Sequence, residues 1–90
     1  MGESAITCVI DRIDQAELKA IESVFTASEN KIVVDMRRVR GTTPAGVARL
    51  ARLVRLAQRR SVIVEVVGAS PAARRALVDA GLHHLVALSE

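Results

Sequence analysis

The feature that most constrains the fold is the stretch formed by residues 31–60. It begins with a β-branched run, residues 32–34, that ends at Asp35, and such a run is typical of a strand covered on both faces. A basic loop follows, and then Thr43 and Pro44 open an amphipathic helix. Threonine caps free backbone N–H groups and proline suits the first helical position. A buried strand, a loop and a helix in this order indicate a parallel α/β unit.

Apolar segments on either side of this unit predict three more strands, over residues 6–10, 61–67 and 84–88. A helix is expected to begin at Asp14, because Glu17 stands three residues later in the relation of a capping box. Its buried stripe is predicted from residues at helical spacing, namely Leu18, Ile21, Val24 and Phe25.

The last helix is predicted after Ser70 and Pro71, which repeat the cap-and-proline start, and Gly81 is expected to end it in a left-handed conformation. Helices between successive strands require right-handed crossovers and a mostly parallel sheet. We therefore predict an α/β fold with one domain over residues 1–90. It has a mostly parallel four-stranded sheet with packed helices, in the order β-α-β-α-β-α-β.

Composition excludes several classes of protein. Ninety residues can form one core without metal or disulfide staples. The single cysteine, Cys8, cannot form an internal disulfide and suits a reducing compartment; we expect it to be a small buried hydrophobe on the first strand. No apolar stretch approaches the roughly 18 residues of a membrane span, and the N-terminus carries no basic leader. We therefore expect a cytoplasmic protein that does not insert into a membrane.

The net charge of +3 hides an asymmetry along the chain. Residues 1–36 carry three basic and seven acidic side chains, whereas residues 37–90 carry ten basic and three acidic ones. Eleven of the thirteen basic residues are arginines, whose planar guanidinium group pairs well with carboxylates and phosphates. This separation of charge predicts a polar partner rather than a membrane surface.

The predicted helix over residues 44–59 carries much of the positive charge. Steps of three and four residues are expected to align five arginines along one outer face: Arg49, Arg52, Arg55, Arg59 and Arg60. No acidic residue stands three or four positions from any of them, so the arginines repel one another mildly. One interpretation is a solvated face that keeps the protein soluble. The alternative is a surface that binds an acidic partner.

Three segments of the chain carry the motifs of a known family: VVDMRRV at residues 33–39, Gly46 with residues 47–50, and residues 66–85. They resemble, in turn, the V-x-D-L-x-x-V strand end, the G-L-x-x-L helix opening and the closing motif around V-G-x-S-P of the STAS domain. This domain is found in bacterial anti-sigma factor antagonists and in the tails of sulphate transporters. The resemblance runs from about Asp11 to the C-terminus, and it implies a STAS fold and a regulatory, protein-binding role.

In STAS members that act as switches, the loop reads D-S-S-G or D-T-x-G. A kinase-type anti-sigma factor phosphorylates a hydroxyl in the first turn of the helix, and phosphorylation releases the antagonist. Here Gly46 matches the conserved glycine, but the aspartate is absent, and Pro44 and Ala45 bear no hydroxyl. Thr42 and Thr43 are the remaining candidates for phosphorylation, and Thr43 is expected to serve as the helix cap. We therefore predict a degenerate phosphorylation loop.

The loop arginines bear on whether phosphorylation of this loop could release a partner. A phosphoryl group adds roughly −1.5 to −2 charge at neutral pH. Beside Arg37, Arg38 and Arg40, at a helix N-terminus, that charge would be held rather than repelled. A release mechanism based on repulsion therefore fits this loop poorly, and a constitutive acidic partner fits better.

Other chemistry has weak support in the sequence. His83 and His84 are adjacent, so on a strand they would face opposite sides and could not share a metal. Cys8 has no marked orienting group for nucleophilic chemistry, and Asp35 is expected to hydrogen-bond the loop that follows it. The chain has no Walker loop and no G-x-G-x-x-G motif. We expect a protein that is not an enzyme and needs no cofactor or metal.

Two functions of different classes remain. The first is a regulatory module that docks a kinase-type anti-sigma factor or another STAS-system protein. A variant of it is the STAS subunit of an ABC-type lipid-transport complex, in which the same surface contacts an ATPase. The second, ranked lower, is a basic nucleic-acid-binding domain: the pI is about 10.0, but aromatic stacking platforms and a helix-turn-helix pattern are missing. The predicted partner-binding residues are Arg37, Arg38, Arg40, Thr42, Thr43, Arg49 and Arg52.

Overall fold

A computed structural model describes residues 5–89, and its four strands form one parallel sheet, as the sequence predicts. The strands lie side by side in chain order, each paired in parallel with the next. They are β1 (Ala5–Val9), β2 (Lys31–Asp35), β3 (Ile63–Val67) and β4 (Ala87–Ser89). The predicted order β-α-β-α-β-α-β is therefore confirmed, and the sheet is parallel throughout.

The helices are α1 (Gln15–Ala20), α2 (Glu22–Ala27), α3 (Pro44–Arg59), α4 (Pro71–Asp79) and a 3-10 turn, η1 (Leu82–His84). Three of the helices, α1, α3 and α4, begin where the sequence places their caps. The side chains of Asp14, Thr43 and Ser70 each accept a hydrogen bond from the backbone N–H three residues later, at 2.8, 3.0 and 3.1 Å. Each cap satisfies an N–H group that has no partner inside its helix.

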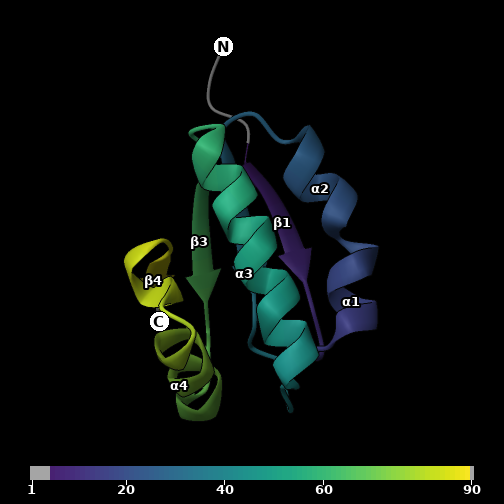
Figure 1. Cartoon of the computed structure of the whole chain (residues 1–90), viewed down its shortest axis with the longest axis vertical. Helices are drawn as coiled ribbons and strands as arrows, with labels where there is room; N and C mark the ends of the chain where they lie inside the picture. Colours follow the sequence, from purple (N-terminus) through teal and green to yellow (C-terminus); the bar gives the residue numbers. More distant parts are fainter. Residues whose placement is uncertain (1–4, 90) are drawn as a thin grey trace.

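The helices pack on one face of the sheet only, with α3 in front of it in Figure 1. Ile32 and Val34 of β2 are fully buried in the single hydrophobic core beneath the helices, whereas Val33 points to the other face and is half-buried. The expectation that this run is covered on both faces is therefore wrong. Right-handed crossovers between strands that are neighbours in chain order bring every helix to the same side.

The first predicted helix is interrupted at Ile21, whose φ of −102° and ψ of 6° leave helical geometry. The break divides it into α1 and α2, and both of these short helices contact α3. The predicted stripe is buried as expected at Leu18 and Phe25, which are fully buried, while Ile21 and Val24 pack at the border of the core.

The last strand is shorter and later than predicted. Gly81 ends α4 with a φ of 74°, as expected, but the chain then forms η1, where the Leu85 and Val86 N–H groups donate to the Leu82 carbonyl. His83 and His84 therefore lie on a turn and not on a strand, with ring centroids 3.9 Å apart. The expectation that they face opposite sides of a strand is wrong, because η1 occupies these positions and β4 begins only at Ala87.

Candidate protein-binding site

The loop between β2 and α3, residues 36–43, lies at the carboxyl edge of the sheet. Its first residue, Met36, is fully buried, and the Met36 N–H donates to the carbonyl of Val67 on β3 at 2.9 Å. The Val39 N–H then donates to the Met36 carbonyl at 3.0 Å. These contacts anchor the start of the loop on the core, as expected for a loop that leaves a parallel strand toward a helix.

The far half of this loop is bonded to the chain between β1 and α1. The Arg40 N–H donates to the Asp11 carbonyl at 3.2 Å, the Ile13 N–H donates to the Gly41 carbonyl at 3.0 Å, and the Thr43 N–H donates to the Ile13 carbonyl at 2.9 Å. The last two of these bonds form an isolated parallel bridge between Ile13 and Thr42. The loop is therefore held in place along its length by backbone hydrogen bonds to the neighbouring segments.

Asp35 fixes the first arginine of the loop. Its Oδ1 accepts from the Arg37 N–H at 3.0 Å and from Arg37 Nε at 3.2 Å, which confirms that the carboxylate bonds the following loop. The backbone N–H of Arg37, helped by its guanidinium and the charge of Arg38, holds the pKa of Asp35 below its usual value. Gly68, at a φ of 70°, leaves the space in which the Arg37 side chain packs.

The three loop arginines are all exposed, but they differ in their partners. The Arg37 and Arg38 side chains are about 70% exposed (71% and 70%) and pair with Asp35 and Asp11, each at 3.2 Å. Arg40 is exposed and forms no ion pair with any residue in the range 5–89. Surface ion pairs of this kind are weak, so Arg37 and Arg38 can exchange them for contacts with a partner.

The two candidate hydroxyls have different surroundings. Thr43 Oγ1 accepts from the Gly46 N–H at 3.0 Å, which confirms its role as the cap of α3. Thr42 is exposed and lines a small pocket of about 50 Å³ that also includes Arg40 and Ser70. The cap geometry supports the interpretation of a degenerate loop, while phosphorylation of either threonine stays a prediction.

Gly46 is the point at which α3 meets the chain between β1 and α1. It is buried, and a Cβ at this position would collide with the Ile13 carbonyl group and with Asp14 Cα. Because both obstacles are backbone atoms, no side-chain rotation can make room. The glycine that matches the STAS pattern is therefore required by packing.

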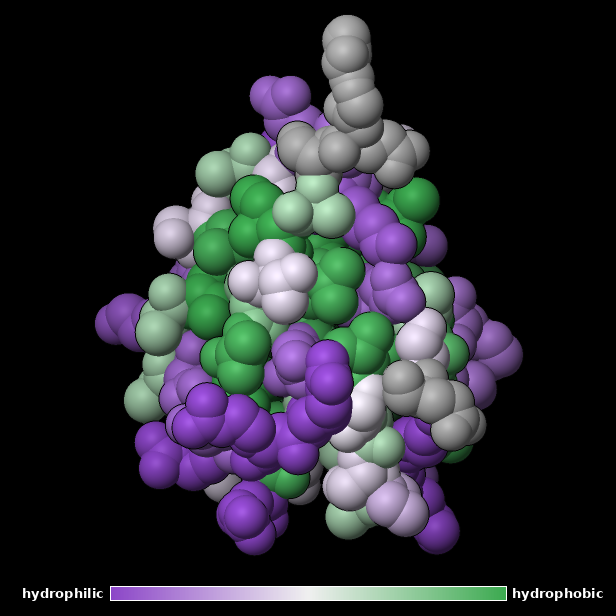
Figure 2. Space-filling model, turned by 180° about the vertical axis from the view of Figure 1, so that it is seen from behind, coloured by the Kyte–Doolittle hydropathy of each residue, from purple (hydrophilic) through white to green (hydrophobic). Residues whose placement is uncertain are grey.

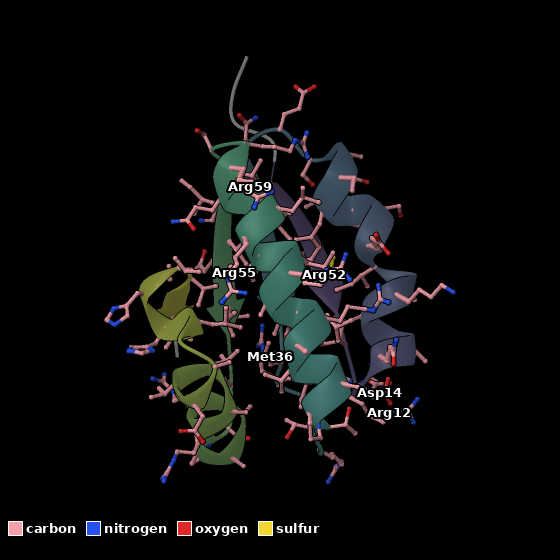
Figure 3. All side chains as sticks on the ribbon, in the orientation of Figure 1. Arg12, Asp14, Met36, Arg52, Arg55 and Arg59 are labelled. Carbon is pink, nitrogen blue, oxygen red and sulfur yellow. The ribbon has the colours of Figure 1, made fainter. Side chains whose placement is uncertain are left out.

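The arginines of α3 do not form the single free face predicted from their spacing. Arg49 is half-buried and its Nη1 lies 3.4 Å from Glu22 Oε1, and Arg60 Nη1 donates to the Phe25 carbonyl at 2.9 Å. These partners come from α2, so spacing within α3 could not predict them. The other three point away from the sheet (Figure 3) and form no ion pair in the described part of the chain: Arg52, Arg55 and Arg59.

These arginines border a groove of about 230 Å³ along the outer side of α3. We call it the arginine groove, and it is lined by Glu22, Arg49, Arg52, Leu53, Arg55, Leu56 and Arg59. Leu56 is half-buried and supplies apolar surface between the charged side chains. Leu56 and Glu22 were not predicted from the sequence, although a leucine placed between Arg52 and Arg59 on the basic face is a detectable departure from the charge pattern.

Residues 5–89 give little support for a metal site, a membrane-spanning helix or a reactive thiol. No group of three histidine, cysteine, aspartate or glutamate side chains gathers there in a way that could hold a metal ion. None of the helices in that range is long and apolar enough to cross a membrane. Cys8 is buried on β1, as predicted, and burial raises the pKa of its thiol, which makes the thiolate scarcer.

Comparison with known proteins agrees with the resemblance read from the sequence. A family model described as "Mlab, STAS domain" matches residues 5–87, from the first residue of β1 to the first residue of β4. No curated protein matches the chain.

Proposed function

This chain belongs to the STAS domain family, and on that basis we propose that it is a non-catalytic module that docks an acidic protein. The docking surface is the residue 36–43 loop together with the arginine groove. The partner is a kinase-type anti-sigma factor or another protein of a STAS system. Docking requires no phosphorylation of the STAS domain.

The observation that carries this proposal is a set of guanidinium groups that form no ion pair with residues 5–89 and that surround an apolar strip. Arg52, Arg55 and Arg59 are exposed beside Leu53 and Leu56. Interfaces combine an apolar centre with a polar rim, and arginine is enriched in them. A partner helix with an apolar residue flanked by carboxylates would match both the charge and the shape of this groove.

The loop explains why the docking needs no phosphoryl switch. The Thr43 hydroxyl is engaged as a helix cap, and Pro44 and Ala45 occupy the positions where switching members carry hydroxyls. A phosphoryl group here would lie near Arg37, Arg38 and Arg40, which attract it. Partner release therefore depends on something other than repulsion from this loop.

A second partner class uses the same surface. In the STAS subunit of an ABC-type lipid-transport complex, the loop and helix contact an ATPase and no phosphorylation is needed. The firm backbone bonding of residues 40–43 to the chain between β1 and α1 supports such a constitutive contact. The two classes differ in the partner and not in the residues of this chain that bind it.

Binding of each purified candidate partner to charge-reversal variants tests the proposal. Arg52→Glu combined with Arg55→Glu should weaken binding by about 100-fold or more at low salt, and by less at high salt, because the contacts are electrostatic. Arg75→Glu is the control: Arg75 is an exposed arginine on α4 that pairs with Asp79, and its reversal should change binding less than about threefold.

Three outcomes would contradict the docking surface. One is full affinity in the Arg52 and Arg55 variant, and another is an equal loss in the Arg75 control. The third is a wild-type chain that binds duplex DNA at physiological salt and neither protein, which would favour the nucleic-acid alternative.

A further inference from the structure

Within residues 5–89 no element covers the face of the sheet opposite the helices, and this face carries exposed apolar side chains beside a few charged and hydroxyl groups. Its apolar side chains come from all four strands: Ala5, Val9, Val33, Ile63, Val67 and Ala87. Val9 is 52% exposed and Ile63 is 59% exposed, the highest values among the large apolar side chains between residues 5 and 89. Figure 2 looks at this side and shows the hydrophobic surface gathered over the sheet.

Such a face is unusual for an all-parallel sheet. Parallel sheets occur almost entirely in proteins whose two sheet faces are both covered. Contiguous apolar patches on soluble proteins mark interaction sites. A covering layer is therefore expected on the uncovered sheet face, and the helices between residues 5 and 89 all pack on the other side.

The charged groups on the same face are already paired with one another. Lys31 Nζ lies 2.8 Å from Glu65 Oε1, and the Ser89 hydroxyl donates to Glu65 Oε2 at 2.7 Å. Asp35 is bonded to Arg37 at its edge. Lys31 balances Glu65, and Arg37 of the adjoining loop balances Asp35. With Arg37 included, the uncovered sheet face has no net charge to repel a copy of itself.

This balance distinguishes the two sides of the molecule. Three arginines of the arginine groove, Arg52, Arg55 and Arg59, have no ion pair within the described residues, so two copies repel each other there, and an acidic partner fits. The uncovered sheet face offers an acidic partner no unpaired cation of comparable exposure, but it accepts an apolar face whose charges are satisfied. A second copy of this chain presents such a face, because it carries the same residues.

We infer that the uncovered sheet face is the interface of a homodimer, in which two copies pack sheet against sheet about a two-fold axis. Two twisted sheets pack this way with their side chains interdigitated, and an isologous contact requires a self-compatible surface. Both arginine grooves then face outward, so the dimer displays two docking surfaces. The inference stands on different residues from the proposed function and does not depend on it.

Sedimentation velocity and light scattering across a concentration series test the dimer. Wild type should pass from monomer to dimer as its concentration rises. Ile63→Glu and Val9→Lys should each weaken self-association by about 100-fold or more, because a charge would be buried between the sheets. In their own sheet these charges have opposite neighbours, since Ile63 is paired in register with Lys31 and Val9 with Asp35. The variants should therefore fold.

Val78 is the matched control, because it is 45% exposed on α4. Val78→Glu and Val78→Lys should leave self-association within about twofold of wild type. A wild-type chain that stays monomeric at the highest concentration overturns the inference. So does a dimer that survives Ile63→Glu, since Ile63 lies on an inner strand and that dimer would use another surface, such as the β1 edge. If one variant fails to fold, as judged by circular dichroism, the other decides the outcome.

Discussion

Two strand-to-helix junctions of this protein use the same four-residue device but serve different ends. Thr43-Pro44-Ala45-Gly46 opens α3, and residues 70–73, which read Ser-Pro-Ala-Ala, open α4. In both, the hydroxyl of the first residue accepts from the N–H of the fourth. The local chemistry that starts a helix is therefore duplicated along the chain.

The junctions differ in everything that depends on distant residues. The α3 junction is a long basic loop bonded to the chain between β1 and α1, whereas the α4 junction is three residues long and includes Gly68 at positive φ. The fourth residue is Gly46 in one and the buried Ala73 in the other. The cap therefore sets where a helix begins, while its tertiary neighbours set what the junction can do.

The largest expected effect is at the fourth residue of each device. Helix propensity alone would make Gly46→Ala stabilising. We expect it instead to destabilise the fold by about 2–3 kcal/mol, because the new methyl meets fixed backbone of Ile13 and Asp14. Ala73→Gly should cost about 1–2 kcal/mol through propensity and a lost buried methyl. Urea unfolding measures both, and a stabilised Gly46 variant would contradict the packing described here.

The next effect concerns the short junction. Gly68→Ala should destabilise the fold by about 1–2 kcal/mol, because an alanine is strained at a φ of 70° and its methyl displaces the Arg37 side chain. Gly41→Ala is the control, since a Cβ there meets nothing within 4 Å. Thermal unfolding of the two variants should separate them, and equal melting temperatures would show that the positive φ at Gly68 costs nothing.

The two cap hydroxyls are expected to have similar, smaller effects. Thr43→Ala and Ser70→Ala should each cost about 1 kcal/mol, because each leaves one helix N–H group without its partner. Thr43→Ser keeps the cap and should retain nearly full stability. Partner affinity should fall more in the Thr43→Ala variant than in the Ser70→Ala variant, since only α3 carries the arginine groove. A reversed order would move the docking surface toward α4.

The smallest effect is a dependence on pH that belongs to one junction only. The pKa of Asp35 lies below its usual 3.8 in the folded protein, so its bonds to Arg37 stabilise the fold above that value. This stabilisation is lost as the pH falls through the lowered pKa. The residue paired with Asp35 in β3 is Val67, which stands just before the α4 junction and does not titrate. The α4 junction therefore has no equivalent of this carboxylate. Asp35→Asn should flatten the acid limb of the stability curve, and an unchanged limb would show that Asp35 contributes little.

The fold was largely predictable because its signals are local. The caps at Thr43 and Ser70, the left-handed Gly81 and the β-branched strands depend on residues that are near neighbours in the sequence. The uncovered sheet face was not predictable from any one strand, because it follows from the order in which the strands pair. The break at Ile21 has no glycine or proline to mark it.

The candidate site likewise combines local contacts, which the sequence predicts, with contacts between distant segments, which it does not. The Thr43 cap and the bond from Asp35 to its following loop are local, and the sequence predicted both. The partners of Arg49 and Arg60 come from α2, which lies more than twenty residues earlier in the chain, so spacing within one helix could not locate them. The binding roles of Arg37, Arg38, Arg40, Thr42, Thr43, Arg49 and Arg52 stay predictions.

The strand order β1-β2-β3-β4 also bears on how the chain reaches its final form. Each strand pairs with the one synthesised just before it, so no later strand has to insert between two earlier ones. During translation the nascent polypeptide can add one β-α unit at a time to a growing edge, with short loop closures at each step. Vectorial assembly of this kind leaves little room for misthreaded intermediates.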